Sequence, residues 1–110
     1  MKTYTAIIYV GLKNRHTGDL WPMETITNTV RAYVQVGLCV TVTPLTFYYV
    51  NGSENGVAVG LINYPRFPSS KKKILNHAKQ LGRQLLENCQ QDRVSIVCSD
   101  KTIMLNKSGE

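Results

Sequence analysis

The stretch GVAVGLINYPRFPSSKKK, residues 56–73, decides the fold of this chain. Its first half is the most continuously apolar run in the sequence, and such a run is typical of a strand that is covered on both faces. Two prolines then interrupt the pattern, and the pair Ser69 and Ser70 follows. A serine can accept a backbone N–H bond at the first turn of a helix. The stretch therefore predicts a central strand over residues 57–64 and a helix that begins after Ser69 or Ser70.

On either side of this stretch, runs of β-branched and aromatic residues alternate with runs of helical periodicity. Strands are predicted for residues 4–12, 38–50, 57–64, 93–99 and 102–105, and helices for residues 22–36 and for the run after Ser70. Pro44 cannot donate a hydrogen bond to a neighbouring strand, so its strand should lie at an edge or contain a bulge. Residues 51–56 combine Asn, Gly and Ser, and we expect them to form the connection of a hairpin.

The order of the predicted elements is β-α-β-β-α-β, followed by a short strand. With right-handed crossovers, this order predicts an α+β fold: a ferredoxin-like βαββαβ sandwich with an extra short C-terminal strand, whose antiparallel sheet carries two helices on one face. The 110 residues fit a single domain over residues 1–110, with residues 106–110 as a frayed polar tail. The loop over residues 13–19 and the hairpin should share one end of the sheet. Residues 63–73 should lie at the other end, so His16 and Lys72 should not share a site within one monomer.

The charge of the chain favours anionic partners. Lys and Arg number 13 against 7 Asp and Glu, a net charge of +6, which suits a nucleotide, a nucleic acid or an acidic protein surface. The cysteines Cys39, Cys89 and Cys98 have neither zinc-binding nor redox spacing, so we expect free thiols in a reducing compartment. No signal peptide is visible, and no apolar run reaches the roughly 18 residues that a membrane span needs, so we expect neither feature. We therefore expect a cytoplasmic protein without a metal or a cofactor.

The strongest candidate site is the start of the second predicted helix. A helix N-terminus carries unpaired N–H groups and a partial positive charge, so acidic residues normally lie there. Here Lys71, Lys72 and Lys73 occupy the first turn, and an anion bound at that end would offset their repulsion. Arg66 could add a further charge, and Tyr64 could add a stacking surface for a base. The alternative is that the three lysines are solvated side chains on flexible stems.

A second candidate site is the loop over residues 13–19, which gathers basic, imidazole, hydroxyl and carboxylate groups. Loops at the ends of central strands often carry function. Arg15 and His16 are the ligand contacts predicted here, and His16 could carry a proton near neutral pH. An exposed polar loop without a function explains the same residues, because acid–base work needs a partner for the imidazole.

The run Ile8-Tyr9-Val10-Gly11 resembles the first ribonucleoprotein motif of RNA-recognition domains, which lies on the first strand of the same fold. The resemblance ends after that glycine. The second motif would place two base-stacking aromatic residues on the third strand, where this chain has Val57 and Val59. Tyr9 alone cannot form such a platform, so nucleic acid is the less favoured partner and the residues indicate no family.

The predicted sheet suggests self-association. Ile7 and Tyr9 should lie on the face opposite the helices, and an uncovered apolar face is usually an interface. The first hypothesis is therefore a non-catalytic, homo-oligomeric binding module for an anionic ligand, nucleotide-like or phosphate-bearing, which could sequester a nucleotide signal. Such a ligand could lie between two subunits.

Two alternative functions stay open on the sequence alone. One is a small enzyme of the dimeric α+β-barrel type, with His16 or Asp19 as the acid–base group. The other is a viral or mobile-element inhibitor that binds a protein through Trp21 and the tyrosine-rich hairpin over residues 47–49. The three hypotheses place the function at different residues, so the geometry of the fold bears on all of them.

Overall fold

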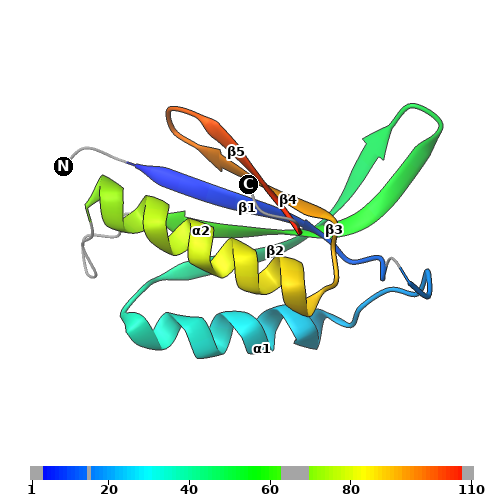
Figure 1. Ribbon diagram of the computed structural model, residues 1–110, viewed down its shortest axis with the longest axis horizontal. Helices are drawn as coiled ribbons and strands as arrows, with labels where there is room; N and C mark the ends of the chain where they lie inside the picture. The colour runs from blue at the N-terminus through cyan, green and yellow to red at the C-terminus, as the bar shows by residue number, and fades with distance from the viewer. Residues whose placement is uncertain (1–3, 15, 63–69, 108–110) are drawn as a thin grey trace.

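The computed structural model describes residues 4–14, 16–62 and 70–107, which form a five-stranded antiparallel sheet with both helices on one face (Figure 1). In chain order the elements are β1 (Thr5–Gly11), α1 (Met23–Tyr33), the 3-10 turn η1 (Val34–Val36), β2 (Val40–Tyr49), β3 (Gly52–Ile62), α2 (Lys71–Asn88), β4 (Arg93–Cys98) and β5 (Thr102–Asn106). The strand order is β2-β3-β1-β4-β5, so β1 is the middle strand. The predicted α+β class and antiparallel sheet are confirmed, and Pro44 lies on an edge strand as expected.

Successive residues of β1 show which face of the sheet the helices cover. Ala6, Ile8 and Val10 are fully buried, whereas Ile7 and Tyr9 between them are only half-buried. Neighbouring residues of a strand point to opposite faces. The first set therefore faces the helices, and the second lies on the other side of the sheet, which we call the open face. The faces that the sequence predicts for these five residues are confirmed.

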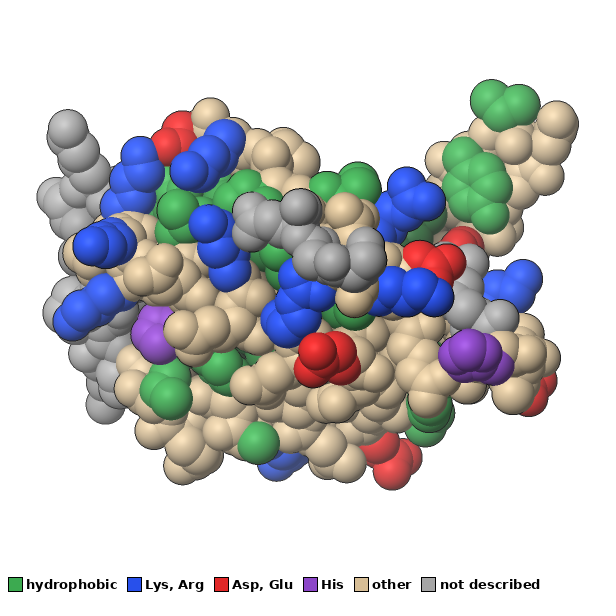
Figure 2. Space-filling view, in the orientation of Figure 1, with side chains coloured by type: hydrophobic (Ala, Val, Ile, Leu, Met, Phe, Trp, Pro, Cys, Tyr) green, Lys and Arg blue, Asp and Glu red, His purple; other side chains and the backbone are tan. Residues whose placement is uncertain are grey.

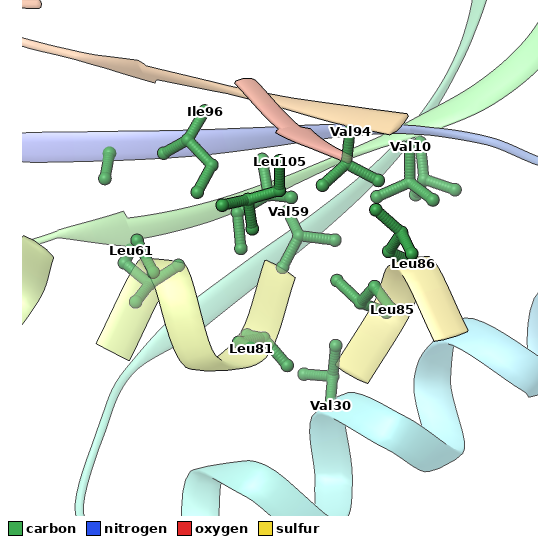
Figure 3. Close-up of a cluster of buried hydrophobic side chains, with 14 of the residues drawn as sticks. Val10, Val30, Val59, Leu61, Leu81, Leu85, Leu86, Val94, Ile96 and Leu105 are labelled. Atoms are coloured by element: carbon green, nitrogen blue, oxygen red, sulfur yellow. The ribbon is translucent and has the colours of Figure 1, made fainter. Parts of the chain in front are cut away.

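Both helices contribute an apolar stripe to the core that lies between them and the sheet (Figure 3). Val30 of α1 points toward Leu81 and Leu85 of α2, and Leu86 of α2 lies beside Val10 of β1. The largest fully buried side chains are Ile8, Val10, Ile26, Val57, Val59, Leu61, Ile74, Leu81, Leu85, Cys89, Val94 and Ile96. Full burial of one aliphatic side chain contributes about 1.5–3 kcal/mol, so this single layer between the helices and the sheet dominates the stability of the fold.

The ends of the helices follow local signals in the sequence. Ser70 accepts a hydrogen bond from the N–H of Lys73 at 3.2 Å and so caps α2, as predicted. Helix α1 begins at Met23 but ends at Tyr33, where η1 replaces the last predicted α-helical turn. Gly37 then takes a φ of 102°, a left-handed conformation that glycine adopts without strain. No helix in the described part of the chain is long and apolar enough to cross a membrane.

The hairpin between β2 and β3 differs from the prediction. Its turn lies at Val50 and Asn51, and residues 52–56 pair with β2 instead of forming a connection. A Cβ at Gly56 would overlap the ring of Phe47 across the strand pair. Glycines in a strand often mark such a close approach. The small residues that suggested a loop are therefore strand residues that leave room for aromatic rings.

The longer hairpin extends past its neighbouring strand. The ladder between β3 and β1 ends at Gly11 opposite Gly56, apart from one hydrogen bond from the N–H of Leu12 to the carbonyl of Asn55. Residues 46–55 therefore form a two-stranded projection, which we call the arm. The arm rises on the side of the sheet that faces away from the helices (Figure 1).

The expectation that β3 is covered on both faces is wrong. Val57 and Val59 are buried against the helices, as expected for one face. The alternate residues Gly56, Ala58 and Gly60 lie on the open face, where no second layer of helices or strands covers them in the described residues. The run is apolar on both sides because its second face consists of small residues that neighbouring side chains shield.

Candidate functional site

A hollow of about 320 Å³ lies beside the arm, between the arm and the loop that connects β1 to α1. This space, which we call the arm hollow, is lined by Lys13, Gly18, Leu20, Tyr49, Ser53, Glu54 and Asn55. Ligand sites start at about 300 Å³ and combine apolar walls with a few polar groups. The arm hollow offers an aromatic ring, a carboxylate, an ammonium group and an amide. The prediction that the two loops share one end of the sheet is confirmed.

The carboxylate of Glu54 lies over the backbone of Gly11, where β1 ends on the open face. A Cβ at Gly11 would overlap Oε2 of Glu54 and would come within 2.9 Å of Oε1 of Gln91. Gln91 is only 2% exposed, and its Nε2 donates to the carbonyls of Lys13 at 2.8 Å and Cys89 at 2.9 Å. These two bonds fix the amide, with its oxygen toward Gly11. The missing side chain at Gly11 therefore lets a carboxylate of β3 approach an amide of the segment after α2.

Aromatic rings adjoin this carboxylate. The rings of Tyr9 and Phe47 meet edge to face on the open side, with centroids 6.1 Å apart and 66° between their planes. Tyr49 follows two residues later on the same strand, lines the arm hollow and is more than half exposed. An exposed ring beside polar groups can stack on a nucleic-acid base, which contributes about 1–3 kcal/mol. The arm hollow therefore has one wall that suits a flat heterocycle.

The loop between β1 and α1 is held by its own backbone and by Trp21. Lys13 pairs with Leu20 in an isolated bridge, and the backbone N–H of Trp21 donates to the carbonyl of Leu12 at 2.7 Å. The indole N–H of Trp21 donates to the carbonyl of Cys89 at 2.6 Å, so the ring is tied to the end of α2. Of the two elements in the inhibitor hypothesis, Trp21 is thus bound to the body of the protein, and the hairpin is the exposed one.

His16 lies outside the arm hollow. It lines a second hollow, of about 280 Å³, together with Glu87, Asp92 and Lys107 near the end of α2. Asp92 and Lys107 form an exposed ion pair at 3.4 Å, and such pairs contribute little to stability. Asp19, the other candidate acid–base group, is exposed and does not line this hollow. The structure therefore does not bring the two groups of the enzyme hypothesis together around it.

The three lysines at the start of α2 differ in their surroundings. Lys71 pairs with Asp100 in the turn between β4 and β5, and its ammonium lies 5.4 Å from the centroid of the Tyr4 ring. The hydroxyl of Tyr4 donates to the same carboxylate at 3.1 Å. The hydrogen bond from Lys71 lowers the pKa of Asp100, and burial raises the pKa of Tyr4 above its usual range. Lys71 thus has partners within the chain, whereas Lys72 and Lys73 are exposed and stay predicted anion contacts.

Three predicted contacts, Arg15, Tyr64 and Arg66, lie outside the residues that the structure describes. Of the others, His16 lies near the C-terminal end of α2 and the lysines lie in its first turn. The helix has 18 residues, which corresponds to about 27 Å. As the sequence predicted, His16 and the lysines cannot form one small-molecule site within a single copy.

The sequence prediction missed Gly11, Tyr49 and Glu54 as site residues. It placed Glu54 in a loop because the surrounding residues are turn formers. The Asn51-Gly52 pair was a signal of a short hairpin turn, which would have put Glu54 back in a strand. The observed turn lies one residue earlier, at Val50 and Asn51, and places Glu54 opposite Phe47.

The thiol and metal chemistry of the described residues is limited. All three cysteines are free, with Cys89 and Cys98 buried and Cys39 half-buried. Burial raises the pKa of Cys89 to about 11, so this thiol stays protonated near neutral pH and packs as a small apolar group. Among the described residues, no group of three or more His, Cys, Asp and Glu side chains could hold a metal ion.

No family model and no curated protein matches the chain, but its fold is similar to solved structures. A phage SAM lyase in its apo state has a TM-score of 0.77 and 17% identity, over 97% of this chain and 91% of that chain. A phage SAM lyase in complex with S-methyl-5'-thioadenosine has a TM-score of 0.74 and 17% identity, over 96% of this chain and 91% of that chain. The de novo designed protein Foldit4 has a TM-score of 0.58 and 13% identity, over 91% of this chain and 99% of that chain. These likenesses show a shared fold.

Proposed function

We propose that this protein binds an adenine nucleoside in the arm hollow and that it does so as a homo-oligomer. The likeness to a phage SAM lyase solved with S-methyl-5'-thioadenosine supports a ligand of this class. The observation that carries the proposal is the composition of the arm hollow. The carboxylate of Glu54, the ring of Tyr49 and the amide of Asn55 line one space of about 320 Å³.

Each part of an adenine nucleoside has a counterpart in this space. The ribose carries neighbouring hydroxyls, and a carboxylate such as that of Glu54 accepts hydrogen bonds from them, as acidic residues do in dinucleotide sites. The ring of Tyr49 offers a stacking surface for the base. The amide of Asn55 can both donate to and accept from the nitrogens of adenine. These contacts suit a nucleoside without requiring a phosphate.

The sequence predicts an anionic ligand, which within this proposal means an adenine nucleoside that carries a phosphate. Lys72 and Lys73 lie at the far end of α2, so a phosphate in the arm hollow could meet them only on a neighbouring copy. Lys13 lines the hollow and is the nearer cation. A phosphate-bearing nucleotide would be favoured through Lys13, and sequestration of a nucleotide signal would follow without catalysis.

Isothermal titration calorimetry with S-methyl-5'-thioadenosine tests the nucleoside site. We expect saturable binding to the wild-type protein and an affinity about ten- to a hundredfold lower for Glu54→Gln, because a hydrogen bond to a charged group contributes about 1.5–3 kcal/mol. Glu87→Gln is the matched control, since Glu87 lines the other hollow and its loss should leave the affinity unchanged. Absence of saturable heat at millimolar ligand, or equal losses in the two variants, contradicts the proposal. Tighter binding of adenosine 5'-monophosphate supports the anionic form.

A second candidate function is catalytic, because both phage proteins of similar fold are SAM lyases. Conversion of SAM to S-methyl-5'-thioadenosine breaks one carbon–sulfur bond of the aminocarboxypropyl chain, and the electron pair of that bond stays on the sulfur. The substrate's own carboxylate oxygen can form the new bond to the released carbon, which closes a lactone. The carboxylate of Glu54 could hold the positively charged sulfur of SAM in the arm hollow. Mass spectrometry of SAM incubated with the protein tests this candidate. S-methyl-5'-thioadenosine formed by the wild type and lost in Glu54→Gln supports an enzyme, whereas unchanged SAM leaves the binding function.

We also infer that the first four strands and the two helices form a ferredoxin-like arrangement to which β5 is added. The order β2-β3-β1-β4 supports this inference, because it puts β1 and β3 inside the sheet. In such an arrangement the open face needs a cover, and a second copy of the chain supplies one in the proposed homo-oligomer.

A further inference from the structure

We propose that the arm and the open face form one self-association surface, and that the tip of the arm packs on a second copy of this chain. This inference rests on the oligomeric part of the proposed function and deepens it by naming the surface. It requires no particular ligand in the arm hollow.

The tip of the arm carries the most exposed apolar side chains of the described residues. Tyr48 is 83% exposed and Val50 is 87% exposed, and Tyr49 between them is also exposed. Tyr48 and Tyr49 are neighbours on β2 and point to opposite faces of the arm, so with Val50 in the turn they make the tip apolar on both faces. Exposed apolar residues gathered in one place usually mark an interaction site on a soluble protein. In Figure 2 the end of this projection shows hydrophobic side chains and no charged ones.

The outer part of the arm is a two-stranded ribbon, although Phe47 and Glu54 contact β1. Its strands pair in register from Thr46 opposite Asn55 to Tyr49 opposite Gly52, and no third strand continues beside them in the described residues. A two-stranded ribbon in water is marginally stable without packing against a further surface. A second copy that covers the arm would supply this packing.

The open face continues the apolar surface of the arm across the sheet. Ile62, Val97 and Met104 are exposed, and their alternation with buried neighbours places all of them on the open face. On the same strand as Ile62, Ala58 and Gly60 add small residues to this face. Both the arm and the β4–β5 hairpin rise on this side, so the open face lies between two projecting hairpins (Figure 1). An apolar face in this position can accept side chains from another molecule.

Charge favours a second copy over an acidic partner on this surface. Among the described residues of the arm and the open face, Glu54 and Arg93 are the charged ones, and they have opposite signs. Apart from Arg93, the described Lys and Arg side chains lie on the other surfaces of the molecule. Lys and Arg side chains are spread over the body of the molecule (Figure 2). Electrostatic repulsion between two identical copies is therefore weakest when they meet through this surface.

The size of the surface suits a stable interface. One buried tyrosine contributes about 150–250 Å² of contact. Tyr48 and Tyr49, with Val50 and the apolar residues of the open face, thus approach the roughly 800 Å² per partner of a standard interface.

Light scattering coupled to size-exclusion chromatography tests this proposal. We expect the wild-type protein at micromolar concentration to have at least twice the chain mass of 12.4 kDa. Val50→Asp should weaken association at least tenfold and shift the mass toward 12.4 kDa, because it places a charge at the tip. Val36→Asp is the matched control, since Val36 is 60% exposed on η1, away from the arm and the open face, and should keep the wild-type mass.

A monomeric wild type, or a Val50→Asp variant that keeps the wild-type mass, overturns the proposal. Circular dichroism checks that Val50→Asp is folded, and Tyr48→Asp at the same tip serves as a second variant. Calorimetry separates the two proposals. A monomer that binds S-methyl-5'-thioadenosine overturns the self-association surface but not the nucleoside site. An oligomer that depends on Val50 and binds no nucleoside supports the surface and contradicts the site.

Discussion

The two faces of the sheet are made of the same strands but differ in what they do for the molecule. On the helix side, Ile8 and Val59 are fully buried in the core. On the open face, their neighbours Tyr9 and Ala58 are half-buried beside the arm. Alternate residues of one strand thus serve stability and the proposed function separately. Variants of adjacent residues should therefore affect one property without the other.

The largest expected effect is on the helix side of β1. Ile8→Ala should lower the free energy of unfolding by about 2–5 kcal/mol, because it leaves a cavity in the core. Ile7→Ala is the matched control on the open face and should cost about 1 kcal/mol or less. Urea unfolding at a protein concentration low enough to favour the monomer measures both values. Equal losses at the two positions would show that the open face is as well covered as the helix side.

The next effect concerns the end of β1. Gly11→Ala should weaken the binding of S-methyl-5'-thioadenosine about tenfold, because the new methyl group displaces the carboxylate of Glu54. The overlapping atom is the end of the Glu54 side chain, which can rotate away, and the hydrogen-bonded amide of Gln91 has to shift only slightly, so the fold should be retained. Ile7→Ala, on the same face of the same strand, should bind like the wild type. If Gly11→Ala also binds like the wild type in calorimetry, Glu54 does not hold the ligand in the way proposed.

Much of the helix side could be predicted from the sequence because burial leaves a periodic pattern. Alternation in β1 predicts that Ile8 faces the helices, and spacing of three and four residues predicts the buried stripe of α2. Ser70 predicts its own cap, and the missing N–H of Pro44 predicts an edge strand. These signals are local and depend on few residues.

The arm and its hollow could not be predicted in the same way. A glycine such as Gly56 is equally typical of a turn and of a strand that passes under an aromatic ring, so the sequence does not distinguish the two. The contact of Gly56 with Phe47 exists only in the folded chain. The partner of Lys71 could not be predicted either, because it is also distant in the sequence. The place of Lys71 in a run of lysines suggested an anion site, but Asp100, 29 positions later, is its partner. Pairings between distant residues decided both cases.

The smallest expected effect is the pH dependence of stability that comes from the ion pair between Lys71 and Asp100. The hydrogen bond from Lys71 lowers the pKa of Asp100 in the folded protein, so the ionised carboxylate stabilises the fold above its ordinary pKa of about 4. This contribution is lost as the pH falls through and below that value. Urea midpoints between about pH 6 and pH 3 should fall less steeply for Asp100→Asn than for the wild type. Lys71→Met should flatten the profile likewise, and identical profiles would mean that the pair contributes nothing.

The most direct test of the account asks which side of the molecule meets a nucleoside. Two-dimensional amide NMR spectra recorded during a titration with S-methyl-5'-thioadenosine report on both sides at once. The largest changes in chemical shift are expected at Lys13, Gly18 and residues 49–55 around the arm hollow. The chemical shifts of residues 70–73 at the start of α2 should stay unchanged. Shift changes centred on Lys71, Lys72 and Lys73, or none at all at saturating ligand, would contradict this expectation.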